Sequence, residues 1–360
     1  MTSYETEQFV LRRSNYSLDD EQQALRDAFR LFFEKHCPSE RVRAAEPLGW
    51  DEALWSQIGE LRPVAMGVPA QQGGDGAGLV ELALVAEELG RRAAPLPLVE
   101  AMVVARLLAA LDGLDESATA ALERLLDGSV VSIAVSATAG RAGRTLVPAG
   151  AVAEAVIGLH GDRLVMASAD VPPPHVPNLA SASLSWWDLA DGVTLATGAP
   201  AVQSFARAEH EWRVLTAATL VGLGQTAVDL GADYAKERYA FGVQIGTFQS
   251  VAHPLADALI GIEGARRLTH RAAWFLDHEP DHAGALAAMA FVHAAEVAER
   301  AGSVGVHTQG GFGFTLESDV QLFYRRAKGW ALVGGDRRAE LQRIADGVIG
   351  ARAIQQGVNA

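Results

Sequence analysis

The sequence predicts an α+β protein that is mainly helical, with three parts in the order helices, strands, helices. Apolar residues recur with helical spacing at residues 1–128 and indicate an N-terminal helical domain. Short β-branched segments separated by Gly, Pro and Asp indicate a small middle β domain at residues 129–205. Residues 206–360 form helical segments of roughly 25 to 30 residues, a length that suits an antiparallel bundle.

The N-terminal part contains four predicted helices. The first begins at the capping residue Ser17, which is followed by acidic residues in the first turn. Its apolar face is formed by Leu25, Phe29, Phe32 and Phe33. The other three are predicted at Trp50–Leu61, Leu79–Arg92 and Pro97–Leu114, and the glycine-rich stretch Gly67–Gly78 predicts a loop.

The middle and C-terminal parts are divided by different signals. Predicted strands lie at Val130–Ser136, Ala155–His160, Arg163–Ala167 and Val193–Thr197. From Glu209 onward the pattern is helical, with predicted breaks at Phe241-Gly242, near Pro280 and at Gly310–Gly313. These breaks predict the turns of the bundle.

Composition excludes several classes of protein. With 360 residues, 49% of them hydrophobic, the chain can bury a core and is not a disordered protein. A net charge of -14 disfavours a nucleic-acid partner. The single cysteine, Cys37, allows no internal disulfide, so a reducing, cytoplasmic location is expected. The uncharged stretch Val214–Val228 is too short for a membrane span, and no metal site is predicted because the histidines form no zinc-binding pair.

Four motifs carry a resemblance to a known family. Tyr234–Asp257 resembles the C-terminal signature of acyl-CoA dehydrogenases, with Arg238 followed by Phe241-Gly242. Three further motifs stand in the same order as in that family: Gly67-Val-Pro with Glu87-Glu88-Leu-Gly90, Gln309–Glu317, and Tyr324-Arg-Arg-Ala327. The resemblance covers the N- and C-terminal thirds of the chain.

The resemblance implies an N-terminal helical domain, a middle β-barrel and a C-terminal four-helix bundle. It also implies FAD bound at a subunit interface and formation of a double bond between the α and β carbons of an acyl-CoA. A carboxylate removes the α proton and the flavin accepts the β hydride, with electron-transfer flavoprotein as the expected electron acceptor.

Several residues match positions that hold FAD in the family. By resemblance Arg238 reaches the pyrophosphate, and its guanidinium fork suits phosphate oxygens. Phe241, Phe248 and Gln249 are predicted to contact the adenosine side of the cofactor. The alternatives are a surface salt bridge for Arg238, a place in the core for Phe241, and an ordinary amide at a helix start for Gln249.

A second group of predicted cofactor residues lies in the glycine turn. Gly310 and Gly311 match the turn whose backbone approaches the FAD of a partner subunit, and Gln309 precedes them. His307 stands where relatives often place a glutamine that contacts FAD. The alternatives are a plain helix-terminating turn and a hydrogen-bonded core histidine.

The expected catalytic base is missing. Alignment on Arg325 places Gly334 at the usual position of the glutamate, and Asp336 is two residues away. A smaller branch places the glutamate just before an arginine, where this chain has Trp212 before Arg213. Glu211 is the remaining candidate base, with a first-turn acid of the helix as the alternative. Arg213 is predicted to meet the acyl-CoA substrate.

The middle domain is also reduced relative to the family. The loops that line the flavin ring are not recognisable at residues 132–143, and Trp186-Trp187 lies later, as a ligand contact or as packing. Loss of the base and of these loops predicts the auxiliary subunit of a heteromeric, α2β2-like dehydrogenase, which shares FAD with a homologous catalytic partner. Analogy with such heteromers suggests a bulky, steroid-type acyl-CoA. The alternatives are a self-sufficient homo-oligomer that uses Glu211, and a non-catalytic acyl-CoA-binding or scaffold protein.

Overall fold

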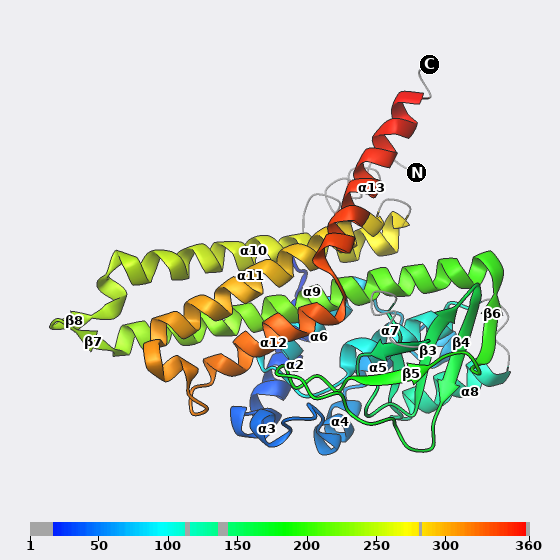
Figure 1. Cartoon of the computed structure of the whole chain (residues 1–360), viewed down its shortest axis with the longest axis horizontal. Helices are drawn as coiled ribbons and strands as arrows, with labels where there is room; N and C mark the ends of the chain where they lie inside the picture. Colours follow the sequence, from blue (N-terminus) through cyan, green and yellow to red (C-terminus); the bar gives the residue numbers. More distant parts are fainter. Residues whose placement is uncertain (1–16, 112–115, 136–142, 281–282, 358–360) are drawn as a thin grey trace.

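The computed structural model describes residues 17–111, 116–135, 143–280 and 283–357, and side chains up to residue 348. Long helices form one layer, the N-terminal helices pack along it, and the strands lie at one end (Figure 1). The predicted order of helices, strands and helices is confirmed. Helix α13 (Arg337–Gly357) leaves the layer and projects from the body of the molecule (Figure 1).

The N-terminal part is helical, as predicted. Its helices are α2 (Asp20–His36), α3 (Ser39–Ala44), α4 (Glu52–Gly59), α5 (Pro63–Met66), α6 (Leu79–Arg91), α7 (Leu98–Ala109) and α8 (Glu116–Leu126). Asp19, not Ser17, caps α2, because Asp19 Oδ1 accepts the Gln22 N–H at 2.9 Å and Gln22 Oε1 accepts the Asp19 N–H at 3.2 Å. The predicted loop at Gly67–Gly78 contains one short 3₁₀ turn at Ala70–Gln72.

The middle part consists of two small sheets. Strands β1 (Val131–Ile133), β3 (Ala155–His160), β4 (Arg163–Ser168) and β6 (Val193–Thr197) pair in that order, with β1 parallel to β3 and the other pairs antiparallel. A separate antiparallel pair joins β2 (Arg144–Val147) to β5 (Ser185–Asp188). The sequence did not predict this pair, which contains Trp186 and Trp187. Trp187 is buried and its Nε1 donates to the Gly150 carbonyl at 2.9 Å, so this residue serves packing.

The C-terminal part is a helical bundle. Its helices are α9 (Gly198–Glu237), α10 (Gln249–His278), α11 (Ala283–Gln309) and α12 (Val320–Val333), which pack against one another. Helix α9 begins at Gly198, inside the region predicted as β. By length and composition α9 is apolar enough to cross a membrane, but 83% of its most apolar stretch is buried, as in the core helix of a soluble protein.

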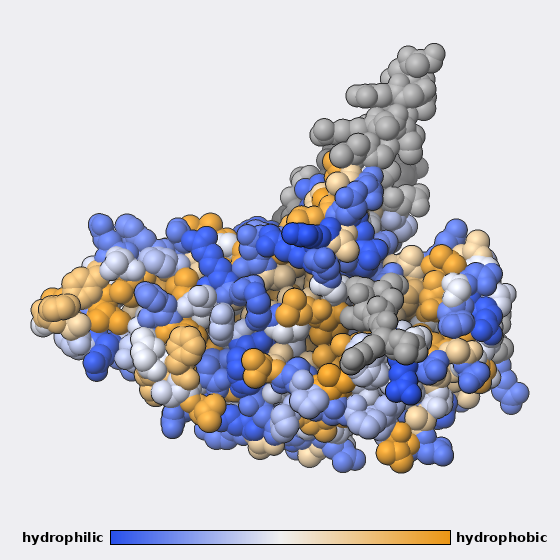
Figure 2. Space-filling model, viewed as in Figure 1, coloured by the Kyte–Doolittle hydropathy of each residue, from blue (hydrophilic) through white to orange (hydrophobic). Residues whose placement is uncertain are grey.

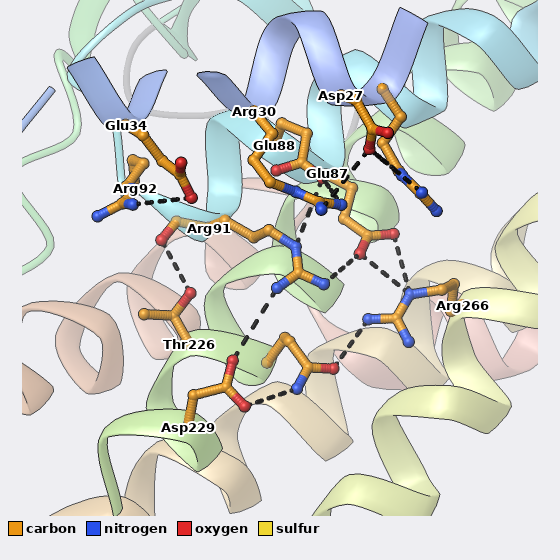
Figure 3. A network of polar contacts seen from close by, with 12 residues as sticks. Asp27, Arg30, Glu34, Glu87, Glu88, Arg91, Arg92, Thr226, Asp229 and Arg266 are labelled. Carbon is orange, nitrogen blue, oxygen red and sulfur yellow. Dashed lines mark hydrogen bonds and ion pairs between the residues drawn. The ribbon is translucent and has the colours of Figure 1, made fainter. Parts of the chain in front are cut away.

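Helix α6 fixes the N-terminal part to the bundle. A Cβ at Gly90 would lie 2.0 Å from the Thr219 carbonyl oxygen, so only glycine lets α6 approach α9 this closely. Charged groups surround the contact (Figure 3). Arg266 Nε lies 3.0 and 3.1 Å from the two Glu87 oxygens and its other nitrogens contact Glu263 and Gln225. This network locates the bundle relative to the N-terminal helices.

Candidate functional site

One candidate site is the tip of the bundle, where α9 ends and α10 begins. Between them lies a hairpin of β7 (Tyr239–Ala240) and β8 (Val243–Gln244), followed by a 3₁₀ turn at Ile245–Thr247. Arg238 is exposed at the end of α9. Its side chain makes no hydrogen bond or ion pair with any residue that the structure describes. The alternative of a surface salt bridge is therefore wrong for Arg238 within the described residues.

Phe241 occupies the turn of this hairpin. It is 97% exposed and has φ of 53°, a left-handed conformation that is strained for a bulky side chain. Its ring meets Phe248 edge to face at 6.3 Å between centroids. Phe241 is therefore not a core phenylalanine, and apolar side chains gather at this end of the molecule (Figure 2). An exposed aromatic side chain on a strained backbone is typical of a contact surface.

The glycine turn lies beside the hairpin. The turn is the 3₁₀ segment Gly310–Phe314, and the Tyr234 ring of α9 stacks on Phe312 at 6.4 Å. Gly310 has φ of +63°, and a Cβ on Gly310 or Gly311 would meet no atom within 4 Å. Both glycines thus leave their backbone open to an approaching molecule. The alternative of a helix-terminating turn is compatible with this geometry, since the turn does end α11.

The other predicted cofactor residues divide into two groups. Gln309 is buried, accepts the Ser318 hydroxyl at 2.6 Å and donates to the Leu230 carbonyl at 3.5 Å, so we assign its side chain to the turn and not to a ligand. His307 and Gln249 are exposed. His307 is therefore not a core histidine. It lines a groove of about 250 Å³ between α10 and α11, together with Ser250 and Thr308.

The second candidate site is a cavity of about 90 Å³ among the three parts of the chain. Its lining includes Leu96, Val99, Glu100, Ala149, Trp212 and Val333. Gly334, the usual base position, follows directly. A Cβ at Gly334 would lie 2.5 Å from Phe291 Cζ and 3.3 Å from Trp212 Cζ3. Gly334 and Trp212, the two positions at which the family resemblance predicts a base, therefore lie next to each other, with aromatic rings around them.

Glu211 does not serve this cavity. Its oxygens accept Arg106 Nε at 2.9 Å, an Arg106 terminal nitrogen at 3.1 Å and Arg207 Nε at 3.1 Å. Burial lowers the pKa of Arg106, but the carboxylates of Glu211 and Asp277 outweigh this and raise it overall. The base role of Glu211 stays a prediction, and these contacts disfavour it because two arginines bind its carboxylate. The first-turn alternative is wrong, since α9 begins at Gly198.

Arg213 is also committed within the chain. It is buried, and its Nε and a terminal nitrogen donate to the two Glu340 oxygens at 3.0 and 3.1 Å. This bidentate pair ties α9 to α13. A substrate role for Arg213 stays a prediction, and it would require this pair with Glu340 to open.

Glu100 is the carboxylate that sequence reasoning missed. It lies in the first turn of α7 and accepts the Trp212 indole N–H at 3.2 Å. Burial raises the pKa of the Glu100 carboxyl. From the sequence alone Glu100 is one acid at a helix start, where a favourable interaction with the helix dipole already explains it. Only the packing of α9 against α7 places it at the cavity.

Comparison with known proteins decides the family. Residues 19–129 match the N-terminal domain of acyl-CoA dehydrogenase, and residues 202–349 match its C-terminal domain. Acyl-CoA dehydrogenase IpdE2 of Mycolicibacterium smegmatis is 30% identical over 330 residues, which cover 91% of this chain and 98% of IpdE2. The chain belongs to the acyl-CoA dehydrogenase family.

Solved structures of acyl-CoA dehydrogenases share the fold. A variant of the Tcur3481-Tcur3483 steroid ACAD has a TM-score of 0.82 at 26% identity, with 93% of this chain and 99% of that chain covered. The ChsE4-ChsE5 complex from Mycobacterium tuberculosis has a TM-score of 0.80 at 23% identity, again with 93% and 99% covered. The predicted four-helix bundle is confirmed, whereas the strands form two small sheets where the family resemblance implied a barrel.

Members of this flavoprotein family bind FAD, and the bundle tip fits part of that cofactor. Arg238 offers an unpaired guanidinium to a pyrophosphate, Phe241 and Phe248 offer rings to an adenine, and Gly310-Gly311 leaves the backbone open. The region expected to line the flavin ring, residues 132–143, includes residues 136–142, which lie outside the described residues.

Proposed function

We propose that this chain is the auxiliary subunit of a heteromeric, FAD-dependent acyl-CoA dehydrogenase. A homologous partner subunit supplies the catalytic carboxylate and the loops around the flavin ring. This chain supplies the bundle tip, which holds the dinucleotide end of the shared FAD. FAD, when bound, supplies the acceptor for the hydride that leaves the β carbon of the acyl-CoA.

The observation that carries this proposal is the contact between Gly334 and Trp212. Each stands where one branch of the family has its glutamate, and neither side chain can take a proton. Phe291 and Trp212 fill the space that a side chain at Gly334 would need. Glu211, the base that a self-sufficient enzyme would use, is held by Arg106 and Arg207. These contacts favour the auxiliary role over the homo-oligomeric alternative.

The tip supports the cofactor half of the proposal. A positively charged side chain with no partner among the described residues of its own chain suits a phosphate group from another molecule. Arg238 would bind the pyrophosphate, with Phe241 and Phe248 beside the adenosine. His307 lies in the groove between α10 and α11, and Gln249 lies at the start of α10. The tip lies at the end of the bundle away from strands β3, β4 and β6 (Figure 1), so in this proposal the partner holds the flavin ring of the same FAD.

The similar proteins support a substrate class and an electron acceptor. Two of the similar structures are the Tcur3481-Tcur3483 steroid ACAD and the ChsE4-ChsE5 complex. We extend both features to this chain, as a heteromer that acts on bulky, steroid-type acyl-CoA. Electron-transfer flavoprotein as acceptor and a cytoplasmic location complete the proposal, in line with the acidic composition and the single cysteine.

The test is an absorption spectrum in the flavin range of the chain purified alone and after co-expression with a homologous dehydrogenase subunit. We expect flavin only in the co-expressed complex. Arg238→Ala should weaken FAD binding about 10- to 100-fold, the equivalent of one or two charge-assisted hydrogen bonds. Arg337→Ala is the matched control, since Arg337 is an exposed arginine at the start of α13 that pairs with Glu296 of α11 at 2.8 Å.

Two results would contradict this function. A yellow lone chain that acyl-CoA bleaches would establish a self-sufficient dehydrogenase. Absence of flavin from both preparations would favour the non-catalytic scaffold.

A further inference from the structure

The interdomain cavity is too small for the substrate of its family. Pockets that bind small molecules have volumes of about 300 to 1,000 Å³. The cavity here measures about 90 Å³, although it touches helices α6, α7, α9 and α12 and the segments at Pro148-Ala149 and Ser181–Ser183. Residues from all three parts of the chain thus line this cavity, but side chains leave little free volume inside it.

The side chain that occupies it is Trp212. It is 3% exposed, and its indole ring lies 5.8 Å from the Phe291 ring at an angle of 49°. One edge of the indole faces Gly334, since Trp212 Cζ3 would lie 3.3 Å from a Cβ there. The ring therefore covers the position where a substrate-facing carboxylate would stand.

Glu100 holds the other edge of the same ring. Trp212 Nε1 donates to Glu100 Oε1 at 3.2 Å, and both residues line the cavity. A buried indole N–H without an acceptor is costly, so this hydrogen bond fixes one orientation of the ring. Phe291 and Glu100 together clamp the indole on its apolar and polar edges.

We propose that Trp212, clamped by Glu100 and Phe291, is a plug that closes the acyl-CoA cavity of this chain. The class of ligand rests on the function proposed above, but the closure rests on the packing alone. In a heteromer the plug restricts substrate binding to one type of subunit, because acyl-CoA enters only the cavity of the partner. Glu100 is a positioning residue in this device.

The test measures binding of octanoyl-CoA to the full chain, purified alone, by isothermal titration calorimetry. We expect no saturable binding to the wild type. Trp212→Ala should bind one octanoyl-CoA per chain and gain about tenfold or more in affinity, because apparent affinity falls with the fraction of molecules whose site is open. Trp212→Leu should change binding in the same direction and serves if the alanine variant does not fold. Coenzyme A without an acyl group should gain less than octanoyl-CoA.

The matched control is Trp55→Ala. Trp55 is also buried, and its Nε1 donates to the Gly128 carbonyl at 2.6 Å, but it does not line this cavity. Loss of Trp55 should leave octanoyl-CoA binding unchanged, whereas Glu100→Ala should increase it by releasing the indole.

The plug is overturned if the wild type binds octanoyl-CoA as tightly as Trp212→Ala, or if folded Trp212→Ala and Trp212→Leu both fail to bind. It is also overturned if Glu100→Gln abolishes turnover by the co-expressed complex, since Glu100 would then act on the substrate. The two binding results are distinguishable from failure of the proposed function, because octanoyl-CoA binding to the lone chain requires no flavin and no partner.

Discussion

The bundle tip and the contact between α6, α9 and α10 use the same residue type in opposite ways. In the α6 contact Arg266 binds Glu87 through Nε (Figure 3), while its other nitrogens contact Gln225 and Glu263. At the tip Arg238 is exposed and has no partner among the described residues. A guanidinium that its own chain satisfies stabilises the fold, and one that the chain leaves open is available to another molecule.

The same contrast separates two carboxylates. Glu211 is surrounded by Arg106 and Arg207, which bind three of its possible hydrogen-bond positions. Glu100 has the Trp212 indole as its side-chain donor and lies in a mainly apolar cavity. The hydrogen-bond partners of a carboxylate therefore separate structural from functional candidate residues, which residue type alone cannot do.

The largest expected effect is the difference in unfolding free energy between the Arg266→Ala and Arg238→Ala variants. Arg266→Ala removes the main partner of the buried Glu87 carboxylate and should lower the free energy of unfolding by about 3 kcal/mol, the lower end for breaking a buried pair. Arg238→Ala should change it by no more than about 0.5 kcal/mol, as for other surface substitutions. Urea unfolding of the lone chain measures both. Equal effects of the two substitutions would remove the distinction between the regions.

A smaller effect is expected within the glycine turn. A Cβ at Gly313 would lie 2.6 Å from the Val306 carbonyl oxygen, so Gly313→Ala requires a backbone shift and should cost about 1 to 3 kcal/mol. Gly311→Ala meets no atom and should leave the thermal midpoint of the lone chain unchanged, yet weaken FAD retention in the co-expressed complex. A stable chain with full FAD retention in Gly311→Ala would place the shared cofactor elsewhere.

The sequence predicted most of the fold because the signals are local. Helical spacing, β-branched segments and glycine breaks located the elements, and β3 and β6 have the predicted ends at Ala155–His160 and Val193–Thr197. The missed β2–β5 pair joins residues about forty positions apart, which no local pattern records. The start of α9 was placed too late because alternation at Val193–Thr197 runs directly into the helix at Gly198.

The candidate site was predictable where its residues belong to one continuous sequence motif. It was not predictable where the site forms from segments that are distant in sequence. Arg238 and Phe241 lie in one stretch of sequence, and Tyr234 of the same stretch stacks on Phe312 of the glycine turn. The ion pairs of Arg213 and Glu211 could not be predicted, because their partners, Glu340 and Arg106, are over one hundred positions away. Glu100 was missed for the same reason, since its contact with Trp212 exists only after α7 and α9 pack.

The smallest expected effect concerns the cavity and depends on pH. Burial raises the pKa of Glu100, so its contribution to stability is fully present below the unfolded pKa of the carboxyl and is lost as the pH rises through the folded pKa. Glu100→Gln cannot ionise and keeps an oxygen that accepts the Trp212 N–H. We therefore expect the unfolding free energy of Glu100→Gln to match the wild type at acidic pH and to exceed it increasingly toward neutral pH. Urea midpoints across that range measure the difference, with Glu123→Gln on the exposed side of α8 as the control. A difference that stays constant with pH would mean that the Glu100 carboxylate remains charged in the folded chain, and the contrast between Glu100 and the paired Glu211 would then be lost.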